Sequence, residues 1–177
     1  MNDIATRRKH ERSKYVEIYH NNACGSGYGS TNHGRAAVGY VLSSAKGEVL
    51  DVGCGHNQFA AALRGAGVAA MGVDFVCPNA DIIAPAHDLP FADGRFDILT
   101  CFDVLEHLLP DEVDAVLAEF ARVSSRYVFS ISTVDSVNRV NGETLHPTVR
   151  PKQWWKERLE AVATVDQMDQ YWVGDFR

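Results

Sequence analysis

Hydrophobic residues are spaced along this chain in two ways, and the two spacings predict different elements. Up to residue 43 the spacing is helical: residues 11–20 place two tyrosines and an isoleucine on one face, and residues 35–43 predict a second helix. The segment 21–34 between them is polar and holds four of the fourteen glycines, so it predicts a loop.

From residue 48 onward, short apolar runs alternate with segments of helical spacing. The apolar runs predict strands over residues 49–52, 68–75, 80–84, 95–102 and 126–132. Helices are predicted over residues 57–67, 110–123 and 152–162, and an antiparallel pair of strands over residues 160–166 and 170–176.

This alternation of strands and helices predicts the fold class. Right-handed crossovers join such strands, so we expect an α/β fold, a Rossmann-like three-layer sandwich around a mainly parallel, doubly wound sheet. Ligands bind beyond the carboxyl ends of the strands in such sheets, which directs attention to the loops after residues 52, 74, 84, 102 and 131.

Length and composition limit the class of protein further. The 177 residues fit one domain, in which residues 1–34 form an N-terminal helix and a glycine-rich lid loop and residues 35–177 form the core. Apolar residues make up 46% of the chain without an apolar run of the roughly 20 residues that span a membrane. The charged N-terminus lacks the apolar run of a secretory signal, so we expect a cytoplasmic monomer or homodimer without membrane contact.

The charge distribution argues against nucleic acid as a partner. With 17 basic and 23 acidic residues, the net charge is −6, whereas nucleic-acid binding depends on clustered positive charge. The one basic cluster, between Arg7 and Lys14, is interpreted as a solvated helix face or frayed terminus. The four cysteines are widely separated and predict reduced, mostly buried thiols.

The strongest candidate for a binding loop follows the first strand of the predicted sheet. Gly53 and Gly55 lie between a strand and a helix, where missing Cβ atoms allow the backbone to approach a ligand closely. Asp51, at the strand end, can accept a hydrogen bond from an ammonium group. The dinucleotide fingerprint G-x-G-x-x-G would need glycine at position 58, but Gln58 is found there.

A second candidate follows the next strand, where Asp74 lies nineteen residues beyond Gly55. A carboxylate in this position can bind the hydroxyls of a ribose, and Phe75 can supply an apolar wall for an adenine. The simpler interpretation of Asp74 is a turn residue that ends a strand. Because the glycine loop lies at the right distance, we favour ribose binding.

Four segments together identify a family. They are VLDVGCG at residues 49–55, GVDF at 72–75, HDLPF at 87–91 and FDILTCFDVLEHL at 96–108. In order and spacing they resemble class I S-adenosylmethionine-dependent methyltransferases, above all the small bacterial enzymes that act on small molecules, quinones and glycans. The resemblance covers about residues 47–133 and implies a seven-stranded sheet with an antiparallel last strand.

The resemblance also implies a role for individual residues in binding S-adenosylmethionine. Its methionine end is expected at Asp51, Gly53, Gly55 and His56, its ribose at Asp74, and its adenine at Phe75, Asp88 and Leu89. Phe102 and Asp103 are expected to line the cofactor near its reactive sulfur.

Histidines are the candidates for a catalytic base, which methyl transfer needs only when the nucleophile must lose a proton. His107 follows Glu106 directly, His146 lies in a loop after the fifth strand, and His33 lies in the N-terminal loop. The simpler interpretation is that Glu106 and His107 cap a turn or bond the backbone at the edge of the site.

A metal site is the less favoured alternative at the same place. Asp103, Glu106, His107 and His146 resemble the metal-binding E-x-x-E-H pattern of small-RNA 2′-O-methyltransferases and ubiquinone-pathway O-methyltransferases, with aspartate in place of the first glutamate. Our prediction is that no metal is needed.

The acceptor is expected to contact Tyr28, His33, His146 and one of two adjacent tryptophans. Trp154 and Trp155 cannot share one helix face, so one is expected in the core and the other, taken as Trp154, in the pocket. For the loop with Tyr28, a lid that excludes water and a disordered leader are the two interpretations.

The sequence therefore predicts methyl transfer from S-adenosylmethionine to an unidentified acceptor, a small molecule or a glycan-type group with an oxygen or nitrogen nucleophile. Two alternatives are a nicotinamide-dependent oxidoreductase, which Gln58 disfavours, and a non-catalytic module that binds S-adenosylmethionine.

Overall fold

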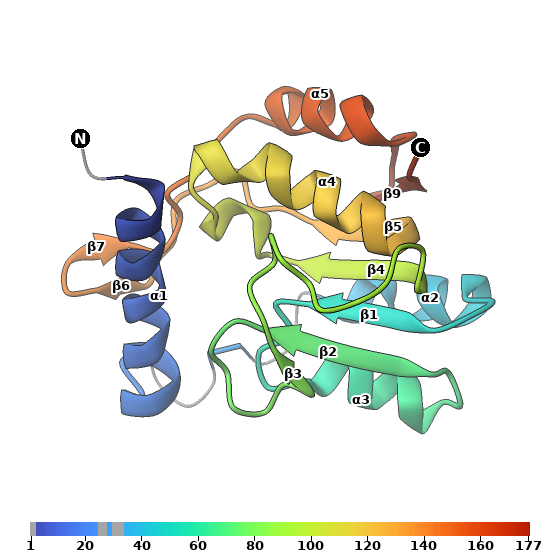
Figure 1. Cartoon of the computed structure of the whole chain (residues 1–177), viewed down its shortest axis with the longest axis horizontal. Coiled ribbons are helices and arrows are strands. Elements are labelled where there is room, and N and C mark those ends of the chain that lie inside the picture. Colours follow the sequence, from blue (N-terminus) through green and yellow to red (C-terminus); the bar gives the residue numbers. More distant parts are fainter. Residues whose placement is uncertain (1–2, 25–27, 30–33) are drawn as a thin grey trace.

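A computed structural model describes residues 3–24, 28–29 and 34–177 of the chain (Figure 1). The α-helices are α1 (Ile4–Asn21), α2 (Val38–Ser44), α3 (Gln58–Gly65), α4 (Val113–Val123) and α5 (Lys152–Val162). Short 3₁₀ helices are η1 (Gly34–Ala37), η2 (Leu105–His107) and η3 (Pro110–Glu112).

Most strands belong to one mixed sheet. Its members are β1 (Val49–Val52), β2 (Ala70–Asp74), β3 (Ile82–Ile83), β4 (Phe96–Phe102), β5 (Ser124–Ser130), β8 (Asp166–Gln167) and β9 (Trp172–Asp175). The strand order is β3-β2-β1-β4-β5-β9-β8, and β9 is antiparallel to β5 whereas the first five strands are parallel. The predicted Rossmann-like fold, with its seven strands and antiparallel last strand, is confirmed.

Helices cover both faces of the sheet, as a doubly wound fold requires. Because side chains alternate across a strand, Leu50 and Leu99 pack beneath α4 and α5, whereas Val49 and Ile98 pack against α2 and α3. The strand order reverses between β1 and β4, whose carboxyl ends point towards α1 (Figure 1). Ligands of such folds bind at this reversal.

Two parts of the sequence-based prediction of secondary structure are wrong. The terminal antiparallel pair is present, but its first strand, expected over residues 160–166, is the shorter β8 at Asp166–Gln167, because α5 continues to Val162 as its helical spacing predicted. The hairpin of β6 (Arg139–Val140) and β7 (Glu143–Thr144) was missed. Its turn is Asn141-Gly142, both with positive φ, and an Asn-Gly pair is a strong hairpin signal.

The N-terminal helix is longer than the predicted segment 11–20. It begins after Asp3, whose side chain accepts a hydrogen bond from the Thr6 amide and caps the helix. The interpretation of its basic residues as a solvated face is wrong for Arg8, which pairs with Glu112, and for Lys14, which is buried beside Glu11. These pairs form because α1 packs against η3 and the β6–β7 hairpin.

Two further predictions concern single residues and membrane contact. Cys54, Cys77 and Cys101 are buried and Cys24 is half-buried, all as free thiols, in agreement with the sequence. Among the described residues, we find no helix with the length and apolar character needed to cross a membrane.

The adjacent tryptophans of α5 provide a test of the core. Trp155 is fully buried and Trp154 is partly exposed, with the Arg158 guanidinium 3.5 Å from its ring centroid. We expect Trp155→Ala to lower the free energy of unfolding by roughly 3–5 kcal/mol, since it leaves a cavity, and Trp154→Ala by less than half as much. Urea unfolding measures both, and equal losses would contradict this packing.

Candidate functional site

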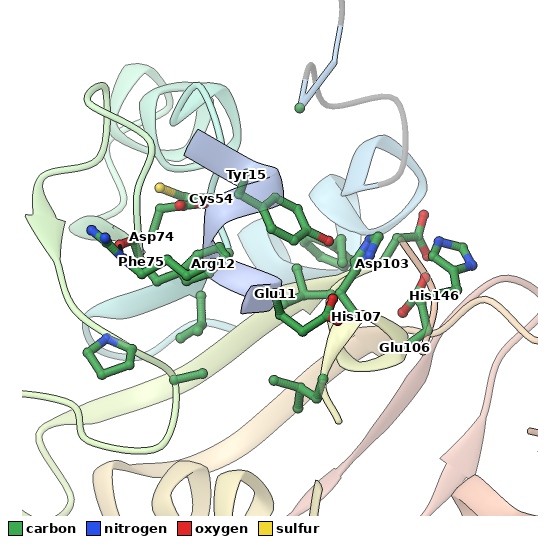
Figure 2. Close-up of a pocket in the computed structure, with 18 of the residues that line it drawn as sticks. Glu11, Arg12, Tyr15, Cys54, Asp74, Phe75, Asp103, Glu106, His107 and His146 are labelled. Carbon is green, nitrogen blue, oxygen red and sulfur yellow. Dashed lines mark hydrogen bonds between the residues drawn. The ribbon is translucent and has the colours of Figure 1, made fainter. Parts of the chain in front are cut away.

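A cavity of about 740 Å³ opens at the carboxyl ends of the parallel strands (Figure 2). The five loops that the topology singled out, after residues 52, 74, 84, 102 and 131, all contribute to its walls. Helix α1 closes the cavity from the other side with Arg12, Tyr15 and Tyr19. One cavity therefore joins most of the residues that the sequence proposed for the cofactor and the acceptor.

The glycine loop forms a tight turn at the bottom of this cavity. The amides of Gly53 and Cys54 both donate to the Val73 carbonyl, at 2.8 and 3.0 Å. Gly53 has φ of +73°, and a Cβ atom there would lie 2.3 Å from a methyl group of Val104. Glycine is therefore required for the loop to pass between β2 and η2.

Asp51 ends β1 beneath this loop and is almost completely buried. Its Oδ1 atom accepts a hydrogen bond from the Thr100 hydroxyl at 2.7 Å. Burial raises the pKa of Asp51 to about 7, against the opposing effect of the Thr100 hydrogen bond. A cation bound in the cavity would therefore favour the ionised carboxylate.

Asp74 ends β2 and connects two of the loops. Its Oδ1 atom accepts hydrogen bonds from the amides of Val76 and Cys77, both at 2.9 Å, and its Oδ2 atom accepts one from the Gly55 amide at 3.1 Å. A carboxylate has about four acceptor positions, so Asp74 can bind one further donor, such as a single ribose hydroxyl. The turn-residue and ligand-binding interpretations of Asp74 are therefore compatible.

Phe75 forms the neighbouring wall, where its ring packs against the ring of Tyr15 with centroids 5.0 Å apart. Ala86 and His87 also line the cavity here, but Asp88 and Leu89 do not. Leu89 is buried in the core, and its amide donates to Glu119 at 2.7 Å. The structure thus brings Phe75 to the cavity and leaves two predicted adenine contacts outside it.

Phe102 and Asp103 continue the cavity wall past the end of β4. Asp103 adopts a left-handed conformation with φ of +51°, and its carboxylate accepts a hydrogen bond from the Ser130 hydroxyl at 2.9 Å. Phe102 packs edge-on against Phe59, with centroids 4.8 Å apart.

Glu106 is fully buried at the end of the cavity where His107 and His146 lie, which we call the acceptor end (Figure 2). Its Oε1 atom accepts a hydrogen bond from the Ser132 amide at 3.1 Å, and its Oε2 atom has no partner within the described part of the chain. Burial, together with the charge of Asp103, raises the pKa of Glu106 to about 8.

His107 and His146 lie beside Glu106 with ring centroids 4.6 Å apart. Nδ1 of His107 is 2.6 Å from the Leu145 carbonyl, and Nδ1 of His146 is 2.8 Å from the Val134 carbonyl. A carbonyl oxygen only accepts hydrogen bonds, so we assign a proton to Nδ1 of each ring, which leaves Nε2 as the nitrogen that can accept one. Burial lowers the pKa of His107 to about 4, which keeps its ring neutral.

The same three residues form a group that can hold a metal ion. One ligand atom from each of Glu106, His107 and His146 lies within 4.8 Å of the others. Metal-binding histidines usually donate their second ring N–H to a carbonyl or carboxylate, as both histidines do here. Glu106 and His107 also bond backbone groups, of Ser132 and Leu145, as the simpler interpretation of this pair expected.

Several predicted residues lie elsewhere. Trp154, on α5, lies outside the cavity, and its ring contacts the guanidinium groups of Arg150 and Arg158. It lies there because α5 covers the same face of the sheet as α4. The structure therefore does not support its prediction as an acceptor contact. His56 also lies outside the cavity lining, 3.3 Å from Asn79, and His33 lies outside the described residues.

The contribution of α1 was missed by the sequence analysis. Tyr15 and Tyr19 line the cavity, and Tyr19 packs against Tyr28, which lines it as expected. The helical spacing of the two tyrosines indicated an apolar face of α1. That spacing carried no information about which surface the face covers.

Comparisons with known proteins agree with this geometry. Residues 50–126 match the family model described as a methyltransferase domain. A ubiquinone biosynthesis O-methyltransferase from Thiobacillus denitrificans is 33% identical over 92 residues, which cover 40% of this chain and 37% of the relative. The match thus spans little more than a third of that relative's length.

Two solved structures share the fold over nearly the whole chain. A 1,6-didemethyltoxoflavin-N1-methyltransferase from Burkholderia thailandensis, solved with its substrate and S-adenosylhomocysteine, has a TM-score of 0.75 at 18% identity, covering 100% of this chain and 91% of that one. A Pyrococcus horikoshii protein has a TM-score of 0.66 at 16% identity, covering 93% of this chain and 98% of that one.

The fold and the matched motifs define a class I methyltransferase domain. Residues 50–126 of the chain match the methyltransferase domain model, in agreement with the family that the sequence motifs resemble. The predictions of an enzyme domain and of S-adenosylmethionine as its cofactor agree with these matches. The roles of single residues stay predictions.

The raised pKa of Asp51 leads to a prediction for cofactor binding. Only the ionised carboxylate attracts the ammonium group of S-adenosylhomocysteine, so affinity should fall about tenfold per pH unit below the pKa of about 7. Asp51→Asn should bind more weakly and lose this part of the pH dependence. Isothermal titration calorimetry between pH 5.5 and 8.5 measures both, and identical pH profiles would contradict the assignment.

Proposed function

We propose that this protein transfers the methyl group of S-adenosylmethionine to a hydroxyl group of a small organic acceptor or a glycan-type group. The observation that carries the proposal is the single cavity that extends from Asp74 and Phe75 to His107 and His146. A volume of about 740 Å³ lies within the range of small-molecule sites and leaves room for a cofactor and an acceptor together.

The cofactor is proposed to lie along the glycine loop. Asp51 and Gly53 would bind its methionine end, Asp74 one ribose hydroxyl and Phe75 one face of the adenine. The sulfur would then lie near Asp103, at the junction with the histidines. Support comes from the common cavity lined by all five residues.

The reaction itself is an in-line displacement. A lone pair of the acceptor oxygen forms a bond to the methyl carbon, the carbon–sulfur bond breaks, and its electron pair stays on sulfur. Orientation and exclusion of water provide most of the rate enhancement, because the sulfonium is already a good leaving group. The hydroxyl proton would pass to Nε2 of His107 or His146, both of which carry a lone pair directed away from their carbonyl partners.

The relatives support a small acceptor without identifying it. One is named an O-methyltransferase and another an N1-methyltransferase, so the names leave the nucleophile open. Two histidines beside the cavity favour a hydroxyl, which must lose a proton, over a neutral amine. The comparisons lend no support to the nicotinamide alternative. A cytoplasmic monomer or homodimer stays a prediction.

Methyl transfer from labelled S-adenosylmethionine tests the proposal. We expect label in at least one hydroxyl acceptor from a panel of phenols, sugars and small alcohols, and none with Asp74→Ala. Thermal shift provides the control, since S-adenosylhomocysteine should stabilise the wild type and NAD should not. Stabilisation by NAD alone would overturn the proposal, and cofactor binding without any turnover would favour a non-catalytic module.

A metal-assisted reaction is the second candidate. Glu106, His107 and His146 offer a mixed oxygen and nitrogen donor set that suits a divalent cation. A bound cation would lower the pKa of a coordinated acceptor hydroxyl. Without a cation, Glu106, whose pKa is about 8, can be protonated and donate a hydrogen bond to the acceptor.

Chelation separates these two candidates. We expect turnover to survive dialysis against EDTA, and His107→Ala to lower kcat by roughly 10²–10⁴ with a hydroxyl acceptor because it removes a general base. The affinity for S-adenosylhomocysteine should be unchanged in that variant. Loss of turnover in EDTA, with recovery on adding Mn²⁺ or Zn²⁺, would assign the metal-assisted reaction instead.

A further inference from the structure

One face of α1 is directed into the cavity. Arg8, Arg12, Tyr15 and Tyr19 follow each other at steps of four, three and four residues, which places them on one side of the helix, and all four line the cavity. The half of this face near Tyr19 is aromatic, whereas the half near Arg8 is cationic. Lys9 adds a further positive charge to the same wall.

Most charged groups around the acceptor end have partners within the protein. Arg8 pairs with Glu112 (through Nε and Oε1), and Glu11 pairs with Lys14 at 2.7 Å. Asp135 pairs with Arg139 at 2.5 Å. Within each pair the two charges neutralise each other, so these residues offer little net charge to a ligand.

Lys9 and Arg12 differ from these residues because they form no ion pair within the described residues. In the parts of the chain that the structure covers, neither has a carboxylate within ion-pair distance, and Arg12 makes one long hydrogen bond, 3.4 Å from its Nε atom to the Phe75 carbonyl. Its two terminal nitrogens are thus available. Figure 2 shows Arg12 at the cavity between Phe75 and the histidine end.

The position of Arg12 relates it to the acceptor. Arg12 precedes Tyr15 by three residues, about 4.5 Å along the helix axis. The Tyr15 ring contacts Phe75 on one side and His107 on the other, with centroids 5.0 and 5.7 Å apart. The Tyr15 ring thus lies between Phe75, whose carbonyl Arg12 contacts, and the proposed base.

We propose that the acceptor is an anion whose carboxylate or phosphate group binds Arg12 and Lys9 while its hydroxyl faces His107. The inference rests on the proposed function and specifies its substrate class. Arginine suits this role because its planar guanidinium can form two parallel hydrogen bonds to a carboxylate or a phosphate. Lys9 would add a second positive charge to the same group.

The experiment uses protein saturated with S-adenosylhomocysteine and three matched probes. These are 4-hydroxybenzoate, 4-hydroxyphenyl phosphate and the neutral 4-hydroxybenzyl alcohol, and calorimetry or ligand-observed NMR measures their dissociation constants. We expect at least one of the two anions to bind at least about tenfold more tightly than the alcohol, the effect of one charge-assisted contact. The two anionic arms distinguish a carboxylate from a phosphate.

Substitutions assign that preference to residues. Arg12→Gln should reduce the preference to less than about threefold, and Lys9→Gln should reduce it in part. Arg7→Gln is the matched control, because it removes the same charge from the same helix, where Arg7 pairs with Asp111 and does not line the cavity. It should leave the preference unchanged.

Three results would overturn the inference. The first is equal binding of the charged and the neutral probes, or no binding of any of them. The second is a preference for the anions that survives in Arg12→Gln. The third is weaker binding of S-adenosylhomocysteine to Arg12→Gln, which would assign Arg12 to the cofactor. Failure of the wild type to bind S-adenosylhomocysteine at all would instead refute the proposed function. The two failures are therefore measured separately.

Discussion

The three hydrogen bonds that the Asp74 carboxylate accepts hold together the two loops at one end of the cavity. They join the glycine loop after β1, through Gly55, to the turn after β2, through Val76 and Cys77. The link fixes the glycine loop at the floor of the cavity. In this loop Gly53 passes close to Val104 in a left-handed conformation. The conformation of the glycine loop is thus fixed by bonds within the protein.

The acceptor end is organised by a different constraint. Glu106 is buried with one oxygen unpartnered, and two histidines present lone pairs to the same region. Three acceptors of hydrogen bonds or metal ions gathered in one place need a positive charge or a proton. A protonated Glu106, a bound cation or a hydroxyl group of a ligand can supply it.

The sequence predicted the sheet and the glycine loop because both depend on local patterns. Alternating blocks indicate parallel strands, and strand-glycine-helix spacing indicates a ligand loop wherever the chain folds. The β6–β7 hairpin was predictable from Asn141-Gly142 but was overlooked. The placement of α1 was not predictable, because its contacts with Glu112 and Phe75 join residues about 60 to 100 positions apart. The positions of Trp154 and Leu89 depend on packing of the same long range.

The central claim is that one cavity holds the cofactor and the acceptor with the reactive sulfur facing the histidines. A crystal structure with S-adenosylhomocysteine tests it most directly. The account predicts the ribose at Asp74, the adenine against Phe75 and the sulfur towards His107 and His146. A cofactor bound outside this cavity, or one whose sulfur faces away from the histidines, would contradict it.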